Sequence, residues 1–361
     1  MPTFTPFLFR FPVVLLLTLA GVVAGNGCTP SEDIPAAQAT AANTAPSSWD
    51  TFITAETLRD WKGTSNLVIV DARSPEKYKA GHIPGAINVP GSKWRTPSRK
   101  PGEGPSKYIF RTADGSPDVQ RYERFLSQAG IGDDSRVVVY GSFGGNKTST
   151  VPVMILRWLG HEKTYFLDGV GLKQWEEAGY EGSTTSHESA PATFTANADS
   201  NFVWNRKDVL RGIDKQNVVI VDTRSKAEYT GENPRDNERG GHVPGAVRVN
   251  YSDLMHWPDR TTLSPAKAQQ VLREKGLTGK EDTTYVLHCQ TSTRVSENYL
   301  VMKDLGYENV AIYDASWHEW GNRADTPIVT GPERAPEQQP YGPAQTSDQP
   351  GSTPSSETSE V

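Results

Sequence analysis

The stretch NLVIVDARSPEKYKAGHIPGAINVP, residues 66–90, decides the fold because the chain uses it twice. It returns as NVVIVDTRSKAEYTGENPRDNERGGHVPGAVRVN at residues 217–250, where ENPRDNERG is an insertion. The shared skeleton is an apolar run, D-x-R-S, a tyrosine and G-H-hydrophobic-P-G-A. Further on, RVVVYGSFGGNKTST at residues 136–150 corresponds to TTYVLHCQTSTRVSE at residues 283–297. Because the order agrees throughout, we interpret the chain as a duplication of one domain.

Each copy alternates short apolar runs with helical patterns, which predicts parallel strands joined by crossover helices. Strands buried on both faces should be continuously apolar, and such runs lie at Leu67–Val70, Val137–Tyr140, Val218–Val221 and Tyr285–Leu287. We therefore expect an α/β fold with two domains, each a parallel sheet flanked by helices on both faces.

A serine followed by a proline marks the expected start of one helix in each copy, because this pair suits the N-cap and first helical positions. A glycine is expected just past the end of each helix. The predicted starts and ends are Ser116-Pro117 with Gly130, and Ser264-Pro265 with Gly276.

Composition sets the predicted domain boundaries. Residues 182–200 are small and polar, so we interpret them as a linker between a first domain at 49–181 and a second at 201–330. Residues 331–361 are mostly Pro, Ser, Thr, Glu and Gln with little to bury, which predicts a disordered tail.

The N-terminus is typical of an export signal. Arg10 is the only charge before an apolar run at residues 11–24, which is too short and too early for a membrane span. In one interpretation residues 1–27 are a signal peptide, Cys28 is acylated, and residues 28–48 are a disordered tether. The alternative is cleavage after Ala24, which gives a soluble exported protein. We favour a periplasmic lipoprotein that meets the membrane only through its lipid anchor.

Charge and cysteine content exclude several classes of function. The formal net charge of -6 gives no reason to expect a nucleic-acid partner. Two cysteines, Cys28 and Cys289, cannot form a disulfide framework. Cys289 has no clustered ligands around it in the sequence, so we expect no metal site, and no cofactor is expected either. We expect a monomer.

Several repeated residues are predicted to be structural. His82 and His242 lie in the same Gly-His-x-Pro-Gly turn of each copy, and a role in both copies favours packing over catalysis. The aspartate and arginine of D-x-R-S are interpreted as a buried ion pair at a strand end. These pairs are Asp71/Arg73 and Asp222/Arg224.

Cys289 has the setting of a nucleophile. A strand ending at His288 and a predicted helix at Val295–Leu305 place it at the carboxyl end of a parallel strand, where open α/β sheets bind ligands. The loop between is expected to form an anion-binding cup of backbone amides with Arg294 at its rim, which favours thiolate over thiol. The cup residues are Gln290, Thr291, Ser292, Thr293 and Arg294. The alternative is a buried cysteine that acts only as a small hydrophobe.

Together these motifs resemble the rhodanese family. The pattern D-x-R-S…Y…G-H-x-P-G-A, then an apolar strand, Cys and a short loop, is similar to that of the family, and GYENVAIYDASWHEWGNRADTPIV resembles its closing strand and Trp-bearing helix. Two copies resemble the tandem thiosulfate and 3-mercaptopyruvate sulfurtransferases over residues 49–330. The resemblance implies that the first copy is catalytically silent, because Gly141 stands at the position of Cys289, and that it is structural with a surface at the shared cleft.

The resemblance also implies the chemistry. The thiolate of Cys289 would take a sulfane sulfur from a small donor, hold it as a persulfide, and pass it to a thiol or cyanide. Residues 290–294 would cradle the persulfide and the donor.

The sequence departs from the family at the donor-binding positions. Its loop reads C-Q-T-S-T-R, whereas the thiosulfate enzymes of animals carry C-R-K-G-V-T and the mercaptopyruvate enzymes C-G-S-G-V-T. Glu228 stands where the family has a donor-binding arginine, and Arg235 matches a second such arginine of the mercaptopyruvate branch. Thiosulfate, mercaptopyruvate and a persulfide therefore all remain possible donors.

Two other functions stay open. H-C followed by a loop and Arg is similar to the H-C-x5-R phosphatases, some of which share the rhodanese fold, but this loop is one residue shorter. The chain could also be a non-enzymatic exported module that carries sulfur or binds a partner.

Overall fold

The computed structural model describes residues 45–96, 108–112, 115–142 and 149–332. The chain divides into two units, residues 1–42 and residues 43–361, and every element described below belongs to the second unit. The predicted signal peptide, Cys28, nearly all of the tether and all but the start of the tail lie outside the described residues.

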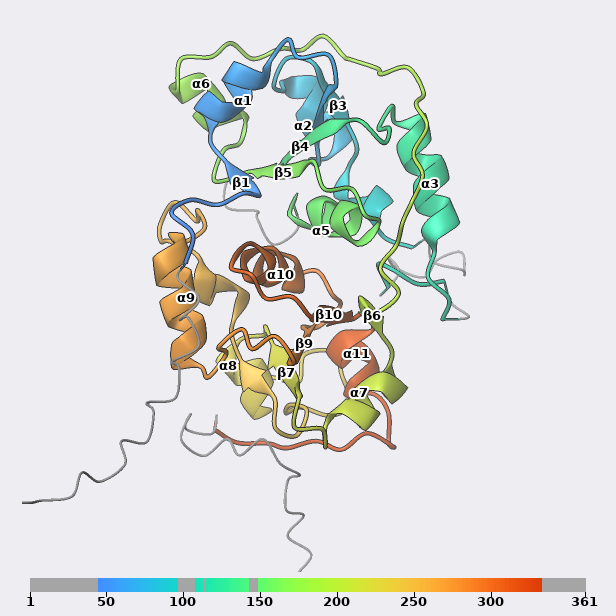
Figure 1. The fold of residues 1–361 in the computed structure, drawn as a ribbon, viewed down its shortest axis with the longest axis vertical. Helices are drawn as coiled ribbons and strands as arrows, with labels where there is room; N and C mark the ends of the chain where they lie inside the picture. The colour runs from blue at the N-terminus through green and yellow to red at the C-terminus, as the bar shows by residue number, and fades with distance from the viewer. Residues whose placement is uncertain (1–44, 97–107, 113–114, 143–148, 333–361) are drawn as a thin grey trace, which may run out of the picture. The chain divides into compact units, whose positions relative to one another are not determined.

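The first sheet has five parallel strands in the order β1-β5-β4-β2-β3 (Figure 1). Its strands are β1 (Phe52–Ile53), β2 (Leu67–Asp71), β3 (Ala86–Asn88), β4 (Arg136–Tyr140) and β5 (Thr164–Leu167). Its helices are α1 (Ala55–Trp61), α2 (Pro75–Ala80), the 3-10 helix η1 (Gly91–Trp94), α3 (Val119–Gln128), α5 (Val151–Trp158) and α6 (Leu172–Glu177).

The second sheet repeats this topology in the order β6-β10-β9-β7-β8. Its strands are β6 (Val203–Trp204), β7 (Val218–Asp222), β8 (Val247–Arg248), β9 (Thr284–His288) and β10 (Val310–Tyr313). Its helices are α7 (Arg206–Gly212), α8 (Lys226–Thr230), the 3-10 helix η2 (Tyr251–Leu254), α9 (Pro265–Glu274), α10 (Val295–Asp304) and α11 (Ser316–Trp320). The expected fold of two parallel α/β domains is confirmed.

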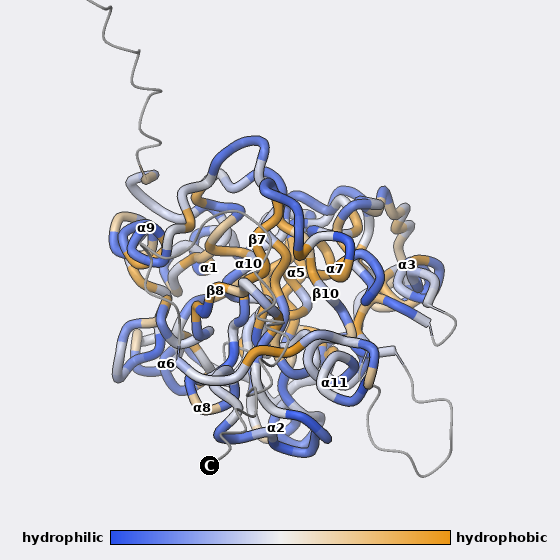
Figure 2. Tube along the Cα trace, turned by 90° about the horizontal axis from the view of Figure 1, so that it is seen from below, coloured by the Kyte–Doolittle hydropathy of each residue, from blue (hydrophilic) through white to orange (hydrophobic). Residues whose placement is uncertain are grey.

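Helices cover both faces of each sheet. Leu58 of α1, Tyr78 of α2 and Trp175 of α6 pack in one cluster on the first sheet. The opposite face contributes to a core that is continuous with the second domain, because α5 and α10 pack together. Hydrophobic residues accordingly concentrate in the interior, around β7 and α5 (Figure 2). At this contact the hydroxyls of Thr150 and Ser296 are 2.7 Å apart.

The expected strands and most helix ends are confirmed. β2, β4, β7 and β9 each include the apolar run predicted for them, and α9 begins at Pro265 after Ser264 as expected. The predicted start at Ser116-Pro117 is wrong, because Pro117 forms a bridge with Arg111 and the helix begins only after Asp118.

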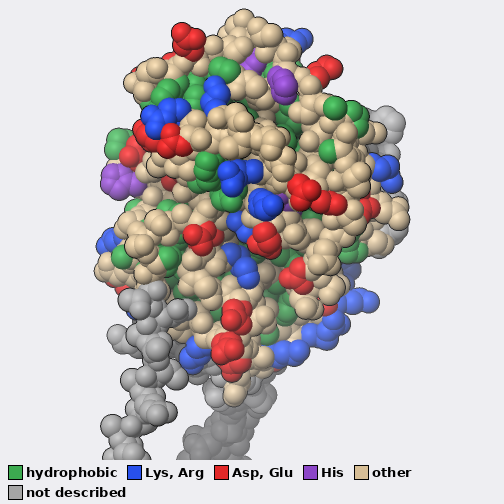
Figure 3. Space-filling model, turned by 45° about the horizontal axis from the view of Figure 1, so that its top comes forward, with side chains coloured by type: hydrophobic (Ala, Val, Ile, Leu, Met, Phe, Trp, Pro, Cys, Tyr) green, Lys and Arg blue, Asp and Glu red, His purple; other side chains and the backbone are tan. Residues whose placement is uncertain are grey.

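The described surface carries mixed charge. On the face seen in Figure 3, acidic and basic side chains are interspersed. Within residues 45–96, 108–112, 115–142 and 149–332, no helix has the length and hydropathy needed to span a membrane.

Candidate functional site

Cys289 lies directly after β9, a central strand of the second sheet between β10 and β7. The residue is 1% exposed, and it is the free cysteine of the described part of the chain. Helix α10 begins at Val295, so the loop joins a strand end to a helix N-terminus as the sequence predicts. Backbone N–H groups at a helix N-terminus favour negative charge nearby.

Ser316 fixes the curve of the cysteine loop. Its Oγ accepts hydrogen bonds from the amides of Cys289 and Ser292, each at 3.2 Å. It also donates to the carbonyl of Tyr313 at 3.0 Å. Sequence reasoning missed Ser316, although it stands two residues after Asp314 where the first copy has Val170 after Asp168. Two of the loop amides are therefore already satisfied by the side chain of the first residue of α11.

Ser292 makes the tight turn of the loop. It is fully buried with a φ of 55°, a left-handed conformation that is uncommon for a residue with a side chain. Its hydroxyl lies 2.6 Å from the carbonyl of Asp314. Farther along α11, the amides of Trp317 and His318 donate to the carbonyls of Cys289 and Gln290, each at 3.0 Å. The loop is thus held on several sides before any ligand binds.

Arg294 forms a bidentate ion pair with Glu228. Its two terminal nitrogens lie 2.7 and 2.8 Å from the two carboxylate oxygens. Burial raises the pKa of Glu228, but the hydrogen bonds and charge of Arg294 outweigh it and bring that pKa to about 2. The expected fork of donors is therefore present at the loop, but its charge is compensated by a carboxylate from α8.

Arg235 belongs to the same charge cluster. Its Nη1 lies 3.3 Å from Oε1 of Glu228, and about half of its side chain is exposed. Nearby, Gln290 donates from Nε2 to Oδ1 of Asn237 at 3.0 Å. The insertion of the second copy therefore contacts the cysteine loop, which its distance in sequence did not reveal.

An arginine from the first domain also reaches the loop. Arg95 donates from Nη2 to the carbonyl of Thr291 at 3.1 Å, and its Nη2 also contacts Oγ1 of Thr293. Sequence reasoning missed this residue, since it is about 200 residues away and no local pattern marks it.

The repeated aspartate and arginine form the predicted ion pair in each copy, and each repeated histidine stacks on a tyrosine. Asp222 and Arg224 are buried, and Nη2 of Arg224 lies 2.5 Å from Oδ2 of Asp222. The guanidinium of Arg224 also lies over the ring of Trp317. His242 stacks on Tyr229 with ring centres 3.7 Å apart. The first copy has the same arrangement in Asp71–Arg73 at 2.5 Å and in His82 on Tyr78.

His288, the residue before the cysteine, is also buried. Burial lowers its pKa to about 4, although the charge of Asp222, whose carboxylate is 3.6 Å from Nε2, opposes this shift. The imidazole is therefore neutral at neutral pH. It supports the end of β9 rather than supplying charge to the loop.

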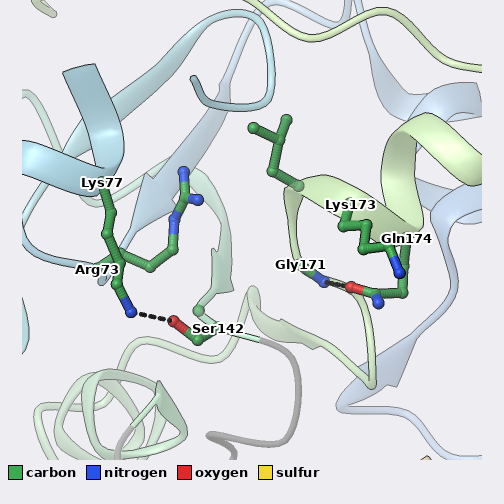
Figure 4. A pocket seen from close by; sticks show the side chains of 8 residues that line it. Arg73, Lys77, Ser142, Gly171, Lys173 and Gln174 are labelled. Carbon is green, nitrogen blue, oxygen red and sulfur yellow. Dashed lines mark hydrogen bonds between the residues drawn. The ribbon is translucent and has the colours of Figure 1, made fainter. Parts of the chain in front are cut away.

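The matching place in the first domain, where Gly141 follows β4, is an open pocket of about 340 Å³. Among the described residues that line it, none is a cysteine. Figure 4 shows Lys77 pointing toward Ser142, with Nζ 3.4 Å from the hydroxyl. A Cβ at Gly141 would lie 1.8 Å from Oγ of Ser149, so a side chain there has no room.

Comparison with known proteins identifies the family. The rhodanese-like domain matches twice, at residues 54–178 and 205–323. Thiosulfate sulfurtransferases of Pseudomonas aeruginosa and Azotobacter vinelandii are each 30% identical to the chain. The matches cover 74% of this chain and 92% of the first protein, and 73% of this chain and 90% of the second. A putative thiosulfate sulfurtransferase of Mycolicibacterium smegmatis is also 30% identical, over 70% of this chain and 88% of its own.

Solved structures with the same fold are more distant in sequence. The anaerobic ergothioneine biosynthesis enzyme from Chlorobium limicola superposes with a TM-score of 0.66 at 22% identity, covering 78% of this chain and 70% of its own. YnjE superposes with a TM-score of 0.64 at 21% identity, covering 80% of this chain and 70% of its own. With both rhodanese-like matches in one polypeptide, the chain belongs to the rhodanese family as a tandem of two rhodanese-like domains.

Proposed function

We propose that the protein is a sulfurtransferase whose nucleophile is Cys289. The observation that carries this proposal is the place of the cysteine, at the carboxyl end of β9 in a loop closed by Ser316 and Arg294. The curated relatives at 30% identity are named thiosulfate sulfurtransferases, which supports the same activity here.

The reaction takes place in two displacement steps. The thiolate of Cys289 attacks the outer sulfur of the donor, a new S–S bond forms, and the old S–S bond breaks. With thiosulfate, sulfite leaves with the bonding electron pair. An acceptor thiolate or cyanide then attacks the outer sulfur of the persulfide and restores the Cys289 thiolate. The loop residues Gln290, Thr291, Ser292 and Thr293 surround the sulfur during both steps.

Thiosulfate is the donor that we favour over 3-mercaptopyruvate. The curated relatives carry the name of the thiosulfate enzyme. Arg235, the residue that resembles the mercaptopyruvate branch, is engaged by Glu228 in the described structure.

The phosphatase alternative is disfavoured by the same ion pair. An arginine that binds a phosphate in an H-C-x5-R loop must direct both of its donors at the ligand. Here both terminal nitrogens of Arg294 are bonded to Glu228. Only an activity assay can distinguish an enzyme from the non-enzymatic module that carries sulfur or binds a partner.

We also propose export and anchoring through Cys28, which lies outside the described residues. This proposal rests on the apolar run at residues 11–24 and the polar segment that follows it. In cell fractionation, the protein should be in the membrane fraction and Cys28→Ser should release it. Unchanged membrane association in that variant would instead favour an uncleaved anchor.

The test of the sulfurtransferase function is an intact-mass measurement before and after thiosulfate. The mass should increase by one sulfur atom, peptide mapping should place that sulfur on Cys289, and cyanide should remove it as thiocyanate. Absence of added sulfur under every donor, together with hydrolysis of p-nitrophenyl phosphate, would establish the phosphatase instead. Sulfur that loads but is never transferred to cyanide or a thiol would favour the carrier.

A further inference from the structure

The open pocket of the first domain lies at the place in its sheet that matches the cysteine loop. It has a volume of about 340 Å³ and lies where Gly141 and Ser142 follow β4. In the second domain, Cys289 follows β9 at the same point of the same strand order. Open α/β sheets bind ligands at the carboxyl ends of their strands, so the duplicated fold is suited to hold a ligand here too.

Three cationic side chains line this pocket. Figure 4 shows Arg73 and Lys77 on one side of it and Lys173 with Gln174 on the other. Lys77 belongs to α2 and Lys173 to α6, so the cations come from separate elements. Among the described residues that line the pocket, none is acidic. The lining therefore favours a ligand with negative charge.

Two of these cations are already paired with carboxylates. Nε and Nη2 of Arg73 bind Asp71, which compensates the charge of the guanidinium. Nζ of Lys173 lies 3.2 Å from Oε1 of Glu177, and both side chains of that pair are more than half exposed. Exposed ion pairs of this kind contribute little free energy, so Lys173 is able to turn toward a ligand at small cost.

Lys77 provides the charge that remains uncompensated. Its Nζ lies 3.4 Å from the hydroxyl of Ser142, which is a neutral partner. Within the described part of the chain, Lys77 forms no ion pair with an acidic residue. A lysine ammonium has three N–H donors, so at least two of them are available to a ligand.

Neutral donors add to this cation. Oε1 of Gln174 accepts a hydrogen bond from the amide of Gly171 at 3.1 Å, which fixes the side-chain amide group. Nε2 of Gln174 donates to none of the described residues, and the hydroxyl of Ser142 is able to donate to an anion as well. An anion in the pocket would therefore find hydrogen-bond donors on both of its sides.

The second copy has the opposite charge at the position of Lys77. Glu228 stands there, and its carboxylate accepts hydrogen bonds from Arg294 at 2.7 and 2.8 Å. The matching cation and anion of the second domain thus satisfy each other within the protein. In the first domain the charge at this position is left for a ligand.

We propose that this pocket is a binding site for a tetrahedral oxyanion of the sulfate and phosphate class. Lys77 binds the anion with Ser142 on one side of the pocket, and Lys173 and Gln174 bind it from the other. Pockets that take small organic molecules start at about 300 Å³, so the site holds either a free ion or the charged end group of a small organic molecule. The site is separate from Cys289, since none of its residues belongs to the cysteine loop.

The test is calorimetric binding of inorganic phosphate to the full chain at low ionic strength, because phosphate donates no sulfur. Lys77→Glu gives the position the charge of the second copy, and Lys77→Arg keeps a cation. Lys79→Glu is the matched control, since it makes the same change of charge at an exposed residue of α2 that does not line the pocket. Thermal unfolding midpoints show whether the variants are folded.

Phosphate should bind the unmodified chain, and Lys77→Glu should weaken this binding roughly 10-fold or more, the scale of one charge-assisted hydrogen-bonding group. Lys77→Arg should retain most of the affinity, and Lys79→Glu should leave it nearly unchanged. Phosphate should also protect Lys77, but not Lys79, from acetylation by acetic anhydride, as measured by peptide mapping.

Phenyl phosphate distinguishes the two sources of the anion. Binding tighter than that of inorganic phosphate would identify the occupant as the end group of an organic molecule. Weaker binding would identify a free ion. Either result supports an oxyanion site, provided that Lys77→Glu weakens the binding.

Three results would overturn the inference. Equal weakening by Lys77→Glu and Lys79→Glu would show that phosphate responds only to the general charge of the surface. Absence of phosphate binding at millimolar concentrations would show that the pocket holds no such anion, and so would unprotected acetylation of Lys77. Persulfide on Cys289 is measured separately, so none of these results decides the proposed sulfur transfer.

Discussion

The ends of β4 and β9 occupy the same place in two sheets of the same topology, yet they differ at three positions beside the proposed site. Gly141 stands opposite Cys289, Tyr140 opposite His288, and Lys77 opposite Glu228. The buried aspartate–arginine pair and the stacked histidine are the same in both. The residues that hold the strand end in place are thus the same in both copies. Function on such a shared fold depends on the few residues that differ.

The largest expected effect is that of Cys289→Ser. The variant should lose sulfur transfer by at least about a thousandfold, because the hydroxyl is a far weaker nucleophile than a thiolate. The unfolding midpoint should barely change, since the two side chains are similar in size. Cyanide-dependent thiocyanate production is the measurement, and retained activity would mean that another residue is the nucleophile.

A second variant tests the first domain directly. It introduces Gly141→Cys into the chain that carries Cys289→Ser. We expect no recovery of activity and a loss of roughly 1–3 kcal/mol in unfolding free energy, because the new Cβ collides with Ser149. Adding Ser149→Gly should restore stability without restoring transfer. We attribute the inactivity of the first domain to a lack of space at position 141 and to its different loop residues. Any turnover by these variants would contradict that explanation.

Ser316→Ala should have an intermediate effect. It leaves the buried amides of Cys289 and Ser292 without their shared acceptor, which should cost about 1–3 kcal/mol of unfolding free energy. We also expect slower persulfide formation, since the loop loses its fixed shape. Val170→Ala, at the matching place in the first domain, is the control and should leave the rate of persulfide formation unchanged.

The last prediction concerns the pH dependence of stability and the ion pair of Glu228 with Arg294, and we expect no change in sulfur transfer as large as that of Cys289→Ser. The folded pKa of Glu228 is about 2, below its ordinary 4.5, so its stabilising contribution is complete above pH 4.5 and is lost as pH falls toward 2. Glu228→Gln should be less stable at pH 7 by roughly 1–3 kcal/mol, and this difference should shrink across that acid range. Lys77→Gln, the matching change in the first domain, should show no such difference. Urea unfolding of the variants and the unmodified protein between pH 2 and 7 measures it.

The sequence was sufficient for the sheets because buried parallel strands need continuous apolar runs, and those of β2, β4, β7 and β9 are short and clearly bounded. The ion pairs and the turn histidines could also be predicted, because residues that occur in both copies are expected to serve the shared scaffold. The start of α3 was missed because the Ser-Pro pair before it is also compatible with an extended turn, and Pro117 is used in a bridge instead.

The residues that complete the site could not be predicted in the same way. Ser316 and Arg95 meet the loop from other segments, and Glu228 meets Arg294 across 66 positions of sequence. No periodicity or motif connects such residues, since their proximity is created by strand order and by packing of α5 on α10. The sequence shows that Glu228 replaces a family arginine, but it does not show that Glu228 pairs with Arg294 of the loop.

The contact between Gly141 and Ser149 also has a consequence for how the two copies can evolve. With Ser149 beside the glycine, a single substitution cannot place a side chain at position 141 without a collision. A side chain there would need changes at both Gly141 and Ser149. Within the described residues, Cys289 is thus the free cysteine at the end of a strand, and the first sheet resists gaining an equivalent of it in one step.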